Sequence, residues 1–209
     1  MATTHDAISQ SEMTPAGALD ALLQGNRRYV ANQRANRDFA AQRAATTGGQ
    51  WPYAAVLSCI DSRASAELLF DAGIGDLFSV RIAGNCVDDD VIGSIEFACK
   101  VAGSKLVMVL GHTSCGAVKG ACDRVEMGHL TTLLSKILPA VDKVAAVDPK
   151  PHDSSNPDFV QHVATCNVEL GVAALRERSP ILREMEAEGA IRLVGAMYDI
   201  ATGEVSLVD

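Results

Sequence analysis

Three residues that bind soft or borderline metal ions stand where two apolar segments of the chain end. Cys59 follows the first segment, YAAVLS, while His112 and Cys115 follow the second, KLVMVLG. Two thiolates and one imidazole suit zinc, and three protein ligands leave a fourth coordination position open, as in catalytic zinc sites. These residues therefore predict a zinc centre that can activate a small ligand such as water.

For each of these residues taken alone, a place in the core is the simpler explanation. Free cysteine is among the most buried residue types. On that ground the other cysteines are interpreted as core residues: Cys86, Cys99, Cys122 and Cys166. Close behind Cys59, however, come two charged residues, Asp61 and Arg63. Charges beside a buried strand need partners, so this pair favours a functional site over plain packing.

Both apolar segments are short, continuous and rich in β-branched residues, which is typical of strands buried on both faces of a parallel sheet. In open α/β sheets, ligands bind outside the carboxyl ends of the strands. Cys59 and His112 should therefore converge if the two strands are neighbours. Cys115 should then open the following helix, where the exposed amide end favours a thiolate.

Three motifs resemble those of the β-class carbonic anhydrases: CIDSR at 59–63, RIAGN at 81–85 and HTSCG at 112–116. The first and third are specific in their order and spacing, whereas RIAGN alone is weak, and the resemblance extends from about Met13 to the C-terminus. It implies one Zn²⁺ per subunit, held by Cys59, His112 and Cys115, with Asp61 and Arg63 as a catalytic dyad. The implied activity is the reversible hydration of carbon dioxide to bicarbonate and a proton, by a zinc-bound hydroxide that the dyad orients.

The resemblance also bears on the state of Asp61. One subgroup of the family closes its zinc site with this Asp as the fourth ligand, and its neighbouring bicarbonate site needs a Trp three residues before the first zinc Cys. Here that position is Val56. We therefore expect the open form, in which Asp61 is paired with Arg63.

In the open subgroup, the substrate pocket is lined by a Gln nine residues before the first Cys and by two aromatic residues. The matching positions are Gln50, Phe78 and Phe97, and the amide of Gly116 adds a polar contact. Phe97 lacks the hydroxyl of the Tyr common in plant-type members. From the residues alone, core packing is the favoured interpretation of either Phe. Part of this pocket comes from a second subunit in the family, which implies a homodimer or homotetramer.

The rest of the chain bounds the fold and its partners. Its 209 residues, 48% of them hydrophobic, predict a flexible N-terminus at 1–12 and a single domain at 13–209. Helices should alternate with strands in an α/β fold: a doubly wound sheet of four parallel strands plus a C-terminal antiparallel edge strand, flanked by helices, with an N-terminal helical arm. The polar segment 34–50 is expected to be a connection.

The net charge of -8 and the pI of about 5.1 argue against nucleic acid or an anionic membrane as a partner. Without a leader-like segment, and with cysteines that must be reduced to bind zinc, the expected location is the cytoplasm. Two other functions stay open. One is a zinc hydrolase of another linear heterocumulene such as carbon disulfide. The other is a non-catalytic zinc-binding or thiol-redox module in which Asp61 permanently occupies the fourth position.

Overall fold

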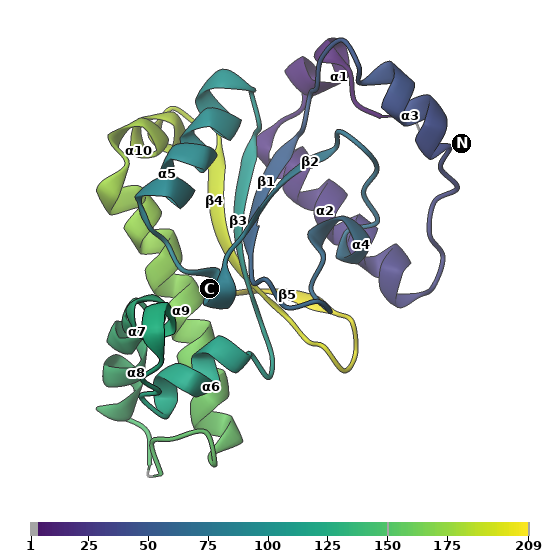
Figure 1. Ribbon diagram of the computed structural model, residues 1–209. Helices are drawn as coiled ribbons and strands as arrows, with labels where there is room; N and C mark the ends of the chain where they lie inside the picture. The colour runs from purple at the N-terminus through teal and green to yellow at the C-terminus, as the bar shows by residue number, and fades with distance from the viewer. Residues whose placement is uncertain (1–3, 150, 209) are drawn as a thin grey trace.

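A five-stranded sheet forms the centre of the computed structural model, which describes residues 4–149 and 151–208 (Figure 1). The strand order is β2-β1-β3-β4-β5. The strands are β1 (Ala54–Ser58), β2 (Leu77–Arg81), β3 (Leu106–His112), β4 (Arg192–Tyr198) and β5 (Val205–Val208). The first four are parallel and β5 is antiparallel to β4, which confirms the predicted sheet.

The burial of the strands follows from their sequences. All residues of β1 and β3 are buried, in agreement with their continuous apolar runs, whereas β2 lies at the edge of the sheet and is half exposed. Side chains alternate between the two faces. Val56 and Met108 enter one core, while Leu57 and Val109 enter the other.

Helices cover both faces of the sheet, as expected for a doubly wound fold (Figure 1). On one face lie α2 (Pro15–Val30) and α4 (Ala66–Leu69), whose apolar side chains pack with Val56 and Met108. The other face is covered by α5 (Asp89–Glu96), α9 (Pro157–Arg178) and α10 (Pro180–Ala187).

Three further helices lie near the carboxyl ends of the strands: α6 (Gly116–Cys122), α7 (Gly128–Ser135) and α8 (Leu138–Ala145). Helices α6 and α8 pack beside α9, and α7 packs against α6 and α8. Pro139 lies in the first turn of α8, where the N–H that proline lacks would have no partner within the helix. Thr14 caps α2 by accepting a hydrogen bond from the amide of Gly17.

The N-terminal part of the chain is more ordered than the sequence indicates. The expectation of a flexible segment at 1–12 is wrong for α1 (Ala7–Glu12), where the buried side chain of Gln10 donates hydrogen bonds to the carbonyls of Pro52 and Ala102. Residues 1–3 lie outside the described part. Similarly, the connection expected at 34–50 contains α3 (Phe39–Ala45), which Asp38 caps.

All six cysteines are buried and unpaired, so the four assigned to the core do lie there. In the described residues, no helix combines the length and the apolar character needed to cross a membrane.

Candidate metal centre

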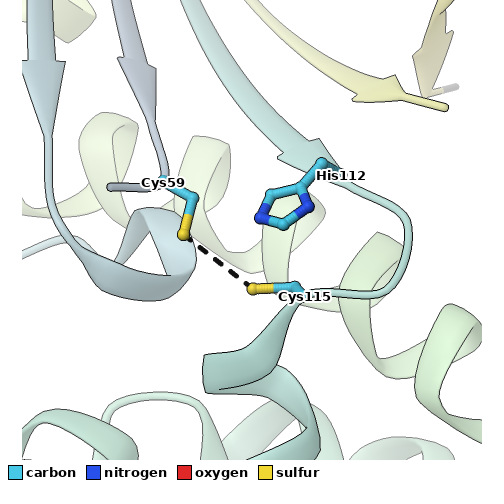
Figure 2. Close-up of side chains that lie close together, drawn as sticks. All are labelled: Cys59, His112 and Cys115. Carbon is cyan, nitrogen blue, oxygen red and sulfur yellow. Dashed lines mark hydrogen bonds between the residues drawn. The ribbon is translucent and has the colours of Figure 1, made fainter. Parts of the chain in front are cut away.

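Cys59, His112 and Cys115 converge at the carboxyl ends of β1 and β3 and the start of α6 (Figure 2). The two strands are hydrogen-bonded neighbours, which is why their ends meet. The ligand atoms of the three residues lie within 4.8 Å of one another, and the two Sγ atoms are 4.0 Å apart. All three side chains are buried.

The imidazole of His112 has one nitrogen occupied and one free. Its Nδ1 lies 2.9 Å from the carbonyl oxygen of Thr113, which can only accept, so Nδ1 carries the proton. Nε2 is buried and has no hydrogen-bond partner among the described residues. An unpaired buried nitrogen lone pair is costly, and a metal ion would satisfy it.

The two thiols differ in acidity when no metal is bound. Cys59 has its pKa lowered to about 4, because its Sγ accepts hydrogen bonds from the Cys115 thiol and from the amide of Gly84 at 3.3 Å. The pKa of Cys115 is raised by that contact with Cys59 and by burial. Without a metal, the proton between the two sulfurs therefore stays on Cys115. Amides of Ala117 and Val118 do lower its pKa, but the adjacent Cys59 thiolate outweighs them.

The residues present fit a tetrahedral zinc ion. With Zn–S bonds of about 2.3 Å, tetrahedral geometry places two sulfurs about 3.8 Å apart. That is close to the 4.0 Å between the sulfurs of Cys59 and Cys115. His112 adds its unpaired Nε2. Three ligands complete the protein's share and leave one position open.

Asp61 lies next to this cluster and is held by Arg63. Its Oδ1 accepts hydrogen bonds from the Arg63 main-chain N and Nε, both at 2.9 Å, and its Oδ2 accepts one from Nη2 at 2.7 Å. Oδ2 also lies 4.0 Å from Nε2 of His112. The bonds from Arg63 hold the pKa of Asp61 well below its usual range, so Asp61 is a carboxylate at neutral pH.

The 81–85 motif folds around the main chain of Cys59, a role that its sequence did not indicate. Arg81 donates from Nε to the carbonyl of Cys59 at 3.0 Å and from Nη2 to the carbonyl of Asp61 at 2.6 Å. Gly84 has a φ of +66°, in the left-handed region that favours glycine. This turn brings its amide to the Cys59 sulfur. The RIAGN motif can be recognised in the sequence, but the hydrogen-bond partners of Arg81 and Gly84 could be found only in the structure.

A cavity of about 280 Å³ opens beside the cluster and is largely apolar. Cys59 and Asp61 line one part of it and Gly116 another, so the structure places Gly116 at this site. The remaining wall is formed mainly by aliphatic side chains, including Ile60, Ala83, Leu130 and Leu134.

Comparison with known proteins places this geometry in a family. The family model for carbonic anhydrase matches residues 54–205. A carbonic anhydrase of Mycolicibacterium smegmatis is 39% identical over 196 residues, covering 92% of this chain and 93% of that protein. In fold, the chain is similar to a β-carbonic anhydrase of Aspergillus fumigatus, with a TM-score of 0.73, 26% identity and coverage of 91% and 90%.

The chain belongs to the β-carbonic anhydrase family. The match begins at β1, so it contains the metal cluster, Asp61 and Arg63 but not Gln50. A solved structure described as a tetrameric β-carbonic anhydrase, from Sordaria macrospora, also has this fold, with a TM-score of 0.70 at 24% identity, covering 91% of this chain and 96% of that one.

Three residues expected in the β-carbonic anhydrase substrate pocket lie away from the metal cluster of their own chain. Gln50 precedes β1 at its amino end, and Phe78 pairs there with Ala55. The ring of Phe97 packs edge-on against Phe78, 6.2 Å between centroids, yet Phe97 is 50% exposed. Cys59, by contrast, follows the carboxyl end of β1. A single chain therefore does not bring these three residues to its own cluster.

Proposed function

We propose that this chain catalyses the reversible hydration of carbon dioxide to bicarbonate and a proton, with zinc held by Cys59, His112 and Cys115. The observation that carries this proposal is the buried set of two sulfurs and an unpartnered imidazole nitrogen in a chain of the β-carbonic anhydrase family. When bound, zinc lowers the pKa of a water ligand from about 15.7 towards 7 and so supplies a nucleophile at neutral pH.

The carbonyl of Thr113 fixes the orientation of the His112 ring for metal binding, because it keeps the proton on Nδ1 and leaves Nε2 free for the metal. Cys59 and Cys115 together contribute negative charge as thiolates. Because thiolates donate more charge than imidazoles, we expect the activity to rise at more alkaline pH than in an all-imidazole site.

Asp61 has the role of orienting the nucleophile in this proposal. As a carboxylate it can only accept hydrogen bonds, and Arg63 fixes both of its oxygens. A fixed acceptor beside the open position can receive the nucleophile's proton in a hydrogen bond and so direct its lone pair towards the substrate. The pairing with Arg63 supports the open form, since it keeps Asp61 from serving as a fourth ligand.

The cavity beside the cluster supports a small nonpolar substrate, because most of its wall is aliphatic. We assign Gln50, Phe78 and Phe97 to the pocket of a second subunit. Their position at the amino end of their own sheet and the exposure of Phe97 support this assignment. The functional unit is then at least a homodimer.

The test is the initial rate of carbon dioxide hydration by zinc-loaded protein between about pH 6.5 and 9. The wild-type rate should rise with pH, and Asp61→Asn should lower it by about 10- to 100-fold while zinc stays bound. A matched control is Asp142→Asn, which breaks an exposed ion pair with Arg124 and should leave the rate unchanged.

Zinc content without turnover at any pH would contradict the proposal. In that case the same protein should be assayed with carbon disulfide. Turnover there would indicate a hydrolase of another heterocumulene, and its absence would indicate a non-catalytic zinc module.

A further inference from the structure

One amide side chain interrupts the apolar face that α9 turns to the core. The buried residues of α9 are otherwise mostly Val, Ala, Phe and Leu, but Asn167 lies among them and is only 7% exposed. Asn is a poor residue for a helix interior, and burial of its amide is costly unless a hydrogen bond compensates. A specific partner is therefore to be expected.

That partner is the turn that faces the metal centre. The Nδ2 of Asn167 donates to the carbonyl of Gly84 at 2.9 Å, and the amide of the same Gly84 donates to the Sγ of Cys59 at 3.3 Å. The two bonds lie on either side of one Cα atom, so fixing the carbonyl restricts the rotation that could move the amide off the sulfur.

The backbone of this turn has little conformational freedom. Gly84 has a positive φ, and a Cβ atom there would lie 2.6 Å from Cδ1 of Ile137. The turn is therefore packed against Ile137, the residue before α8, and it is also tied to α9 by Asn167. Among the described residues, no side chain other than that of Asn167 donates a hydrogen bond to the Gly84 carbonyl.

We propose that Asn167 is a positioning residue of the metal centre: it holds Gly84 so that the Gly84 amide stays on the Cys59 sulfur. Hydrogen bonds to an anionic acceptor are strong, and partners outside the ligand shell orient the ligands and tune the metal. This inference rests on the proposed function, because it requires Cys59 to bind the metal.

The experiment uses Co²⁺ as the probe. Wild-type protein loaded with Co²⁺ should show thiolate-to-cobalt charge-transfer absorption, and Zn²⁺ affinity is measured by competition with a chelator. In Asn167→Leu the absorption should shift, and the affinity for Zn²⁺ should fall by about 10- to 100-fold.

A matched control comes from another buried amide. Asn26 on α2 donates from Nδ2 to the carbonyls of Leu69 and Gly203, and α2 packs on the opposite face of the sheet from α9. Asn26→Leu should lower the melting temperature but leave both the absorption and the Zn²⁺ affinity unchanged. This control separates a general loss of stability from an effect on the metal.

The outcomes distinguish a failure of this inference from a failure of the proposed metal centre. If Asn167→Leu does not fold, the smaller Asn167→Ala is measured in its place. A folded Asn167 variant with wild-type absorption and affinity overturns the inference, as does an equal change in Asn26→Leu. Wild-type protein that shows no thiolate-to-cobalt band would instead refute the proposed metal centre itself.

Discussion

Asp71 is a buried carboxylate that two arginines hold. Its Oδ2 accepts from Nε of Arg28 at 2.6 Å and from the amide of Ala35 at 3.0 Å, and its Oδ1 accepts from Nη1 of Arg37 at 2.5 Å. The side chains of Asp71 and Arg37 are only 3% and 8% exposed. These bonds tie α2 and the segment after it to the end of α4.

Removing this carboxylate leaves Arg37 buried without its partner. We therefore expect Asp71→Asn to lower the free energy of unfolding by about 3 to 5 kcal/mol, as for other broken buried ion pairs. Urea unfolding at pH 7 measures the change. As a control, Asp142→Asn removes an exposed pair and should cost no more than about 1 kcal/mol. An equal loss of unfolding free energy in the two variants would show that the buried ion pairs of Asp71 stabilise the fold no more than an exposed pair does.

The pH dependence of the same residue follows from its shifted pKa. Burial raises the pKa of Asp71, but the hydrogen bonds from Arg28, Ala35 and Arg37 outweigh it and leave the pKa below its ordinary value of 3.8. A lowered folded pKa stabilises the protein above the unfolded pKa, and this stability is lost as the pH falls through the folded pKa. The gap between wild type and Asp71→Asn should be constant from about pH 7 to 5 and narrow below about pH 4. A gap that is unchanged at pH 3 would contradict this assignment.

Among the elements, helix α1 depends on a single buried side chain. Gln10 donates to the carbonyls of Pro52 and Ala102, each at 2.8 Å. Gln10→Ala should lower the free energy of unfolding by about 1 to 3 kcal/mol, because Ala102 then lacks this donor. Ser11→Ala on the same helix removes only an exposed bond to Ile8 and should stay within about 0.5 kcal/mol of wild type. Thermal unfolding of the two variants checks the contrast, and a stable Gln10→Ala would mean that α1 is not part of the cooperative unit.

The elements that the sequence predicted are those with strong local signals. Continuous apolar runs identified β1 and β3. Helices α1 and α3 were missed because isolated helices of this length are marginal in water and depend on tertiary contacts. The contacts of Gln10 reach 42 and 92 residues along the chain, which no local pattern reveals.

The same limit applies to the metal centre. The convergence of Cys59, His112 and Cys115 could be predicted from their positions after strand ends, because the carboxyl ends of parallel strands lie at one edge of the sheet. Asn167 could not be predicted, since its hydrogen bond to Gly84 joins residues 83 apart and a polar residue on a helix gives no indication of its partner. Only the structure reveals hydrogen bonds of this kind, between residues that lie far apart in the sequence.

For the whole molecule, the two halves of the expected site lie at opposite ends of one sheet. The metal cluster is at the carboxyl ends of β1 and β3, while Gln50 and Phe78 are at the amino ends of β1 and β2. If a symmetric dimer places the amino end of one sheet against the carboxyl end of the other, each chain supplies the metal cluster of one site and the pocket residues of the other.

This arrangement makes a prediction about mixed subunits. Cys59→Ser removes a proposed metal ligand and Gln50→Ala removes a proposed pocket residue, so each variant alone should be nearly inactive. In a mixed dimer, the intact cluster of the Gln50→Ala chain receives Gln50 from the Cys59→Ser chain. Random pairing of co-expressed chains makes half of the dimers mixed, each with one complete site, so about a quarter of the wild-type rate should return.

The control for this experiment combines two metal-site variants, Cys59→Ser and His112→Ala. Both residues belong to the same cluster of one chain, whose ligand atoms lie within 4.8 Å of one another, so no pairing of these two chains restores a complete set and no activity should return. Recovery in the first mixture but not in the second means that the metal is held within one chain while Gln50 acts across the interface. Failure of the first mixture, or full activity of Gln50→Ala alone, would contradict a pocket shared between subunits.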